Sequence, residues 1–82
     1  MKQDFLHSLL IDVRDRGSVC IEKRKLLWMM GRTNESAGAW EMLLGEWGEV
    51  GGQKQDLHGF EWGNFINLMA KAPDNVAEDW AV

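Results

Sequence analysis

The hydrophobic positions at the start of the chain recur with the period of an α-helix. Apolar side chains that share one helical face lie at Phe5, Leu6, Leu9, Leu10 and Val13, with polar residues between them. This spacing predicts a helix over residues 3–16. Gly17 follows and is well placed to end that helix, because glycine readily adopts the left-handed backbone that closes many helix C-termini.

The second segment, residues 18–30, supports two interpretations. The first is a helix capped by Ser18 and ended by Gly31. Lys23, however, interrupts the apolar stripe that opens the segment. The second interpretation is therefore a short extended stretch over residues 18–21, followed by the helix.

A third helix is expected after a run of residues that suit a helix N-cap. These candidates are Thr33, Asn34 and Ser36. One helical face then follows at Ala37, Trp40, Leu44 and Trp47. Residues 48–59 hold four glycines and show little periodicity, which predicts a glycine-rich loop.

The last part of the chain continues the helical pattern. One face holds Trp62, Phe65, Ile66 and Met69. This spacing predicts a fourth helix over residues 60–71. Pro73 stands just beyond it, and Val76 and Trp80 are placed to pack a last short turn.

Together these elements predict an all-α fold, a bundle of about four short helices with one glycine-rich loop. No pair of segments alternates convincingly between polar and apolar residues, so no strand pair is expected. The 82 residues suffice for a single domain. Residues 74–82 are expected to form a loosely packed C-terminal turn.

The charge of the chain weighs against a protein that binds nucleic acid mainly by electrostatics. Nine Lys and Arg stand against thirteen Asp and Glu, for a net charge of -4. The charge is also split along the sequence. Residues 1–32 carry seven basic and four acidic side chains, and residues 33–82 carry two and nine. Each half therefore offers a feature that a partner can recognise.

The chain shows no sign of secretion or membrane insertion. Its single cysteine, Cys20, has no second cysteine with which to form an intramolecular disulfide, unlike the framework of small secreted domains. No apolar run suits a signal peptide or approaches the ~18 residues of a membrane span. We therefore expect a cytoplasmic protein that does not enter the membrane.

No arrangement of residues indicates catalysis, a metal or a cofactor. Cys20 stands between apolar residues, which predicts a buried and inert thiol, and the two histidines fall in a helix (His7) and a loop (His58). The zinc and calcium spacings are absent. Glu46 and Glu49 are expected to be exposed glutamates instead of a glycosidase pair. We expect a non-enzymatic protein.

Docking on another protein is the function that the sequence favours. Trp28, Met29 and Met30 cannot all face one core, and Met42 lies off the apolar face of the third helix. Exposed Trp and Met beside basic residues are typical of binding hot spots. The predicted partner-binding residues are Trp28, Met29, Lys23, Arg24, Lys25 and Met42. A homodimer through the same patch is a further option.

A short acidic chain also suits a phage or mobile-element protein that inhibits or redirects a host factor. Two hypotheses other than docking on a protein remain. The main alternative is a helix-turn-helix regulator with residues 23–30 as the first helix, Gly31 as the turn and residues 33–41 as the recognition helix. Its DNA contacts would come from Arg32, Asn34 and Ser36. Bulky Leu27 and acidic Glu35 oppose this reading. The third hypothesis is an acidic mimic of nucleic acid that uses Glu35, Glu41, Glu46, Glu49 and Glu61.

Overall fold

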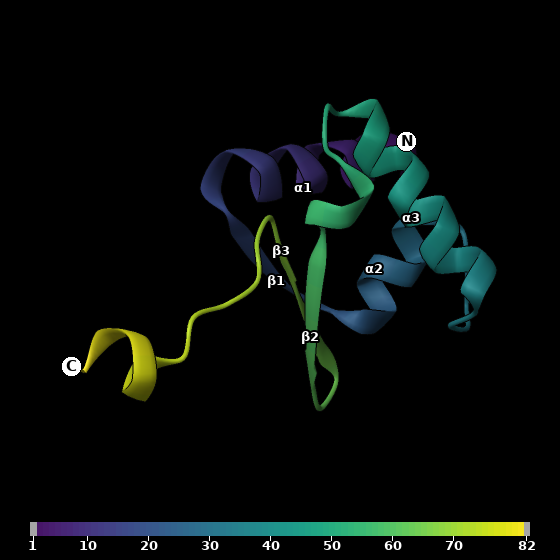
Figure 1. Cartoon of the computed structure of the whole chain (residues 1–82). Helices are drawn as coiled ribbons and strands as arrows, with labels where there is room; N and C mark the ends of the chain where they lie inside the picture. The colour runs from purple at the N-terminus through teal and green to yellow at the C-terminus, as the bar shows by residue number, and fades with distance from the viewer. Residues whose placement is uncertain (1, 82) are drawn as a thin grey trace.

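Three helices lie on one side of a three-stranded antiparallel sheet in the computed structural model, which describes residues 2–81 (Figure 1). The helices are α1 (Lys2–Arg16), α2 (Lys23–Met29) and α3 (Ala37–Glu49). The strands are β1 (Ser18–Glu22), β2 (His58–Trp62) and β3 (Phe65–Met69), and two short helical turns are η1 (Lys54–Asp56) and η2 (Val76–Trp80). The all-α prediction is therefore wrong, because the domain is mixed α/β.

The fourth predicted helix, over residues 60–71, is instead a β-hairpin. β2 and β3 pair antiparallel around Gly63 and Asn64, with Trp62 opposite Phe65. Gly63 has a φ of +58°, as the first central residue of a two-residue hairpin turn requires. The apolar spacing that looks helical spans this turn, so its residues belong to two different strands.

β3 is the central strand, because the strands lie in the order β1-β3-β2. β1 pairs antiparallel with β3, with Ile21 opposite Ile66 and Cys20 opposite Asn67. The extended interpretation of residues 18–21 is thus confirmed, and the helix begins only after β1.

The helix predicted over residues 3–16 is confirmed as α1. Its side chains Leu6, Leu10 and Val13 are fully buried. The helix ends at Gly17, whose φ is +96° and whose amide donates to the Val13 carbonyl at 2.9 Å. This close turn leads the chain directly into β1.

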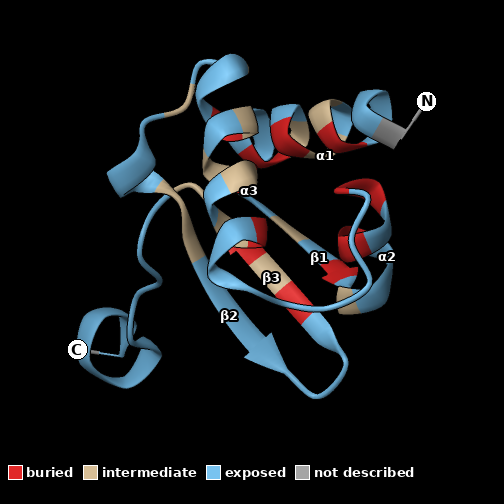
Figure 2. Ribbon diagram, turned by 90° about the vertical axis from the view of Figure 1, so that its right-hand side faces the viewer, coloured by how far each residue is buried: buried red, intermediate tan, exposed pale blue. Residues whose placement is uncertain are grey.

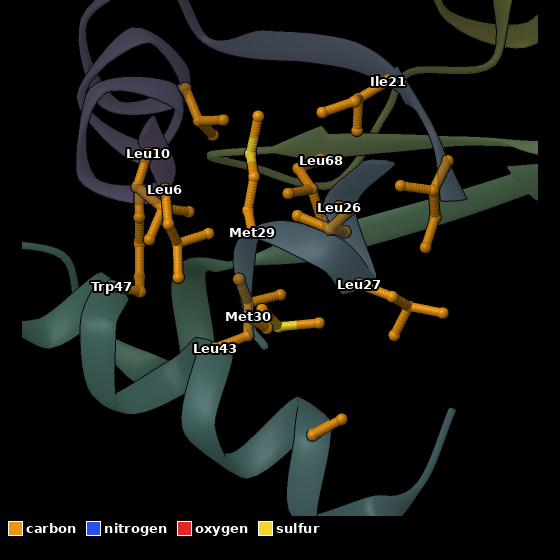
Figure 3. Close-up of a cluster of buried hydrophobic side chains, with 13 residues drawn as sticks. Leu6, Leu10, Ile21, Leu26, Leu27, Met29, Met30, Leu43, Trp47 and Leu68 are labelled. Atoms are coloured by element: carbon orange, nitrogen blue, oxygen red, sulfur yellow. The ribbon is translucent and has the colours of Figure 1, made fainter. Parts of the chain in front are cut away.

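The hydrophobic core fills the space between the three helices and the inner face of the sheet (Figure 3). Its buried members are Leu6, Leu10, Val13, Ile21, Leu26, Leu27, Met29, Met30, Ala39, Leu43, Trp47, Ile66 and Leu68. β1 and β3 contribute alternate residues to it, as strands with one buried face do. β2 contributes none of these residues and is largely exposed (Figure 2).

α3 buries Trp47 as predicted, but the rest of its buried stripe differs from the predicted face. Its buried side chains are Ala39, Leu43 and Trp47, whereas Trp40 and Leu44 are only half-buried. The buried positions are four residues apart and therefore lie along one face of α3. Trp40 and Leu44 instead border the gap between α3 and β2.

The C-terminal end of the chain leaves the domain on the side away from α2 and α3 (Figure 1). We call residues 71–81 the tail. η2 supplies the last turn that the sequence predicts, but Val76 and Trp80 are exposed instead of packed. The predicted loop over residues 48–59 is also shorter than expected, because α3, η1 and β2 occupy much of it.

Candidate interaction surfaces

α2 presents two basic side chains and a tryptophan to solvent beside α1. Arg24, Lys25 and Trp28 are exposed, and the two basic residues lie four and three positions before Trp28, so each is its neighbour on the surface of the helix. Phe5 of α1 packs beside Trp28, with ring centroids 6.0 Å apart and an angle of 32° between the rings. Trp28 is 46% exposed and Phe5 is 54% exposed. We call these four residues the basic–aromatic surface.

The other residues predicted for this surface lie elsewhere. Met29 is buried on the core side of α2, so its predicted exposure is wrong. Met42 is half-buried and packs against the core. The ammonium of Lys23 donates to Glu61 Oε2 at 2.9 Å and to Glu35 Oε2 at 3.1 Å. The bond to Glu61, and then the bond to Glu35, raise the pKa of Lys23 above its ordinary value.

The connection between α2 and α3 does not form the predicted recognition helix. Seven residues, 30–36, join the two helices, whereas a helix-turn-helix uses a turn of about 3–4 residues. Arg32, Asn34 and Ser36 all lie exposed in this connection. The Ser36 hydroxyl accepts a 3.1 Å hydrogen bond from the Ala39 amide, so Ser36 is the N-cap of α3.

The side of the sheet that faces away from the helices carries a second group of exposed aromatic residues. Residues directly opposite one another on paired strands point to the same side. The register therefore places Phe60, Trp62, Phe65, Met69 and Cys20 together on this side. The rings of Phe60 and Trp62 are stacked with centroids 6.3 Å apart, and Trp62 is 74% exposed. We call this side the outer sheet face.

The apolar side chains of β2 point to the opposite side of the sheet from the buried side chains of β1 and β3. Its inward positions are Gly59 and Glu61, which lie opposite the buried Leu68 and Ile66. The Glu61 carboxylate is held by Lys23. All the large apolar side chains of β2 therefore point away from the domain's own core. Exposed apolar patches of this kind mark surfaces that other molecules cover.

Two hollows with mainly apolar linings border β2. The first, of about 310 Å³, separates α3 from β2 and is lined by Trp40, Leu43, Leu44, Leu57, His58, Gly59, Phe60, Glu61, Ile66 and Leu68. The second, of about 410 Å³, lies on the outer sheet face and is lined by Ser18, Phe60, Asn67, Met69 and Pro73. Pro73 belongs to the tail, so the tail already forms one wall of the second hollow.

The residues that would carry catalysis or bind a metal are not gathered at one place. Within the described residues no three His, Cys, Asp or Glu side chains come close enough to hold a metal ion. Cys20 is exposed and not buried as predicted, because it alternates onto the outer sheet face. His7 pairs with Glu46, which Gln3 also bonds at 3.1 Å, and this contact ties α1 to α3.

The five glutamates of the nucleic-acid mimic hypothesis are not all available to a partner. Glu35, Glu46 and Glu61 each bind a basic side chain of this same chain. A mimic has to offer its carboxylates to a partner's basic groove. The pairing of three of the five candidates inside the domain disfavours that reading.

Comparison of this chain with protein-family models, with curated proteins and with solved structures finds no match. Between residues 2 and 81, no helix has both the length and the apolar character needed to cross a bilayer.

Proposed function

We propose that this chain is a non-enzymatic protein-binding module that docks through the basic–aromatic surface. The observation that carries the proposal is the placement of Arg24, Lys25 and Trp28 on one side of α2, with Phe5 of α1 beside them. Tryptophan and arginine dominate interface hot spots, because they combine apolar area with hydrogen-bond donors. Neither cation of this surface forms an ion pair within residues 2–81, so both are available to a partner.

The chemistry of the surface favours, as the partner, a protein with carboxylates around an apolar side chain. The apolar side chain packs on Trp28 and Phe5, while the carboxylates reach Arg24 and Lys25 one helical turn away. The two cations of this surface are few compared with the roughly six to ten phosphate contacts of a salt-dependent DNA binder. We place this docking in the cytoplasm, where an exposed free thiol such as Cys20 stays reduced.

The test is affinity capture from a lysate with matched baits, each run with and without nuclease and read by mass spectrometry. The wild type is compared with Trp28→Ala and with the double variant Arg24→Glu/Lys25→Glu. Trp62→Thr, on the outer sheet face, is the control for loss of an exposed aromatic elsewhere. Circular dichroism confirms that each bait keeps its fold.

The proposal expects a nuclease-resistant protein partner that the wild type and the Trp62 variant retain and that the other two variants lose. A partner captured equally by all baits overturns the assignment of the surface. Capture that disappears with nuclease supports the DNA-binding alternative instead, and variants of Arg32 and Asn34 are then tested.

A further inference from the structure

We propose that the basic–aromatic surface binds the acidic tail of a second copy of this chain in a weak head-to-tail contact. This contact rests on the proposed function, because it uses the same surface and names one partner for it. The tail thus supplies, within the chain itself, a segment with the chemistry that the surface recognises. A different protein that docks on the surface then competes with the tail of another copy.

The charge of the tail is complementary to that of the basic–aromatic surface. One lysine stands against three carboxylates in residues 71–81, which gives the tail a net charge of -2. Glu78 and Asp79 form no ion pair within residues 2–81, and the same holds for the two cations of the surface. The strand register, by contrast, places no Lys or Arg on the outer sheet face. The acidic tail therefore suits the basic–aromatic surface and not the outer sheet face.

The tail also presents apolar side chains beside its carboxylates. Trp80 is 66% exposed and Val76 is 58% exposed. Two carboxylates directly precede Trp80 in the turn η2, and two cations lie within one helical turn of Trp28 on α2. An indole flanked by carboxylates can pack against an indole flanked by cations, with ion pairs at the border of the contact.

The length of the chain favours the tail of a second copy over the chain's own tail. The Ala70 amide donates to the Gly17 carbonyl at 2.9 Å, so the tail begins beside the C-terminal end of α1. Phe5 lies twelve residues before Gly17, about 18 Å away along the helix axis. The four residues from Ala70 to Asp74 span at most about 14 Å. Trp80 Nε1 donates to Asp74 Oδ2 at 3.1 Å, which holds the indole beside Asp74.

With this turn intact, the chain's own tail reaches the surface only by running fully extended along α1. It instead leaves the domain on the side away from α2 (Figure 1). The tail of a second copy arrives without either restriction.

The contact is small, and its expected affinity is correspondingly low. One copy contributes Trp28 and Phe5, each about half exposed, and the other contributes the tail turn. This is less than the roughly 800 Å² that each partner buries in a stable complex, and smaller interfaces are typical of transient encounters. We therefore expect a dissociation constant in the high-micromolar to millimolar range.

The experiment is nuclear magnetic resonance of the isotope-labelled full chain from low-micromolar to millimolar concentration, read at the backbone amides of α2. Arg24→Glu/Lys25→Glu reverses the charge of the surface. Glu78→Lys/Asp79→Asn changes the net charge of the tail from -2 to +1. Asparagine keeps an oxygen for the Asn75 amide, which donates to Asp79 Oδ2 at 2.8 Å.

An equimolar mixture of the two variants separates a contact between copies from a contact within one chain. The mixture pairs the reversed surface with the reversed tail, and the original tail with the original surface, only between different copies. Arg32→Glu/Lys54→Glu is the control for net charge, since it changes the charge as much as the surface variant does, at exposed residues outside the contact. Trp62→Thr is the control for an exposed aromatic elsewhere. Circular dichroism confirms that every variant is folded.

We expect wild-type shifts at α2 that grow with concentration and diminish at high salt. Each charge variant should weaken the association by about fivefold or more, because like charges then face each other. The mixture should recover it, and both controls should associate like the wild type. Shifts that respond to the tail variant but not to concentration would identify the chain's own tail as the occupant and overturn the contact between copies. A wild type without shifts, or a mixture without recovery, overturns it as well.

These outcomes are distinct from a failure of the proposed function. A chain that does not bind its own tail still supports the proposed function if it captures a protein that Arg24→Glu/Lys25→Glu loses. Conversely, self-association that depends on these residues, together with capture that does not, confines the surface to contacts between copies.

Discussion

The indole N–H of Trp47 donates a 2.9 Å hydrogen bond to the carbonyl of Gln53, and this bond closes the glycine-rich loop over the end of α3. Trp47 is only 2% exposed. Gly52 passes so close to the ring that a Cβ on it would lie 2.0 Å from Trp47 Cε2. The absence of a side chain at position 52 is thus a requirement of the packing around this indole.

Gly52→Ala is expected to lower the free energy of unfolding by about 1–3 kcal/mol, because the added methyl group displaces a buried ring. Gly45→Ala is the matched control, since Gly45 lies inside α3 with open space where its Cβ would be. That change should raise stability by about 1 kcal/mol through helix propensity. Urea unfolding measures both, and equal stabilities would show that the indole does not pack against Gly52.

Met29→Ala and Trp28→Ala are expected to differ in how strongly they destabilise the fold. Met29 belongs to the core, so its truncation should cost about 2–5 kcal/mol of unfolding free energy. Trp28 is 46% exposed, so its truncation should cost less than that of Met29. Thermal unfolding followed by circular dichroism compares the two. A Trp28 variant that loses its helical signal would place Trp28 in the core and remove the basic–aromatic surface.

Ser36→Ala is expected to cost about 1 kcal/mol, because the Ala39 amide loses its capping oxygen. Asn34→Ala, in the same exposed connection, should stay within about 0.5 kcal/mol of the wild type. Chemical denaturation separates the two effects. Equal losses would indicate that the connection is stabilised by something other than the N-cap.

Lys23→Met is expected to lower the melting temperature, because Lys23 joins the start of α2 to Glu61 and Glu35. The difference from the wild type should shrink at high salt, which screens partly exposed ion pairs. It should also shrink at strongly alkaline pH. The folded-state pKa of Lys23 is raised, so its stabilisation is present below the unfolded-state pKa and is lost as the pH rises through the folded-state value.

Lys25→Met is the control for this prediction, since no ion pair of Lys25 is seen within the described residues. It removes the same charge from the same helix, two positions away. If both variants lose the same stability, and salt has no effect on either, the contacts of Lys23 do not stabilise the fold.

α1 could be predicted from the sequence, because most of its apolar positions face the domain's own core. The period of Leu6, Leu10 and Val13 matches a helix, and a glycine ends it. Ser36 was identifiable as a capping residue by type. Residues 18–21 were ambiguous, because only two apolar side chains of β1 face inward.

β2 was missed because its apolar side chains point to solvent, whereas the apolar side chains of a strand usually point toward the core. The aromatic side of a segment is usually assigned to the core. In β2, however, Gly59 and Glu61 point inward and the aromatic side chains point outward. One signal was present. Gly63 and Asn64 between two apolar runs form a two-residue pattern typical of hairpin turns.

The candidate site was predicted only in part for a related reason. The sequence showed that Trp28 and its methionine neighbours could not all be buried, but not which of them was exposed. That choice depends on how α2 is rotated about its own axis. The rotation is set by Leu26 and Leu27, which pack into the core beside Met29 and leave Arg24, Lys25 and Trp28 outside. Contacts of α2 with α1 and β1 determine this rotation, and the spacing of apolar residues within α2 does not predict them.

Glu61 opposes the pairing of further strands with the edge of the sheet that β2 forms. β2 is an edge strand, and such strands are templates for adding further strands and for fibril formation. Inward charges and short edge strands oppose this growth. A strand added beside β2 would have to cover the carboxylate of Glu61 and its bond to Lys23. β2 therefore exposes its aromatic side to a contact with another molecule, while its edge resists the repeated addition of strands.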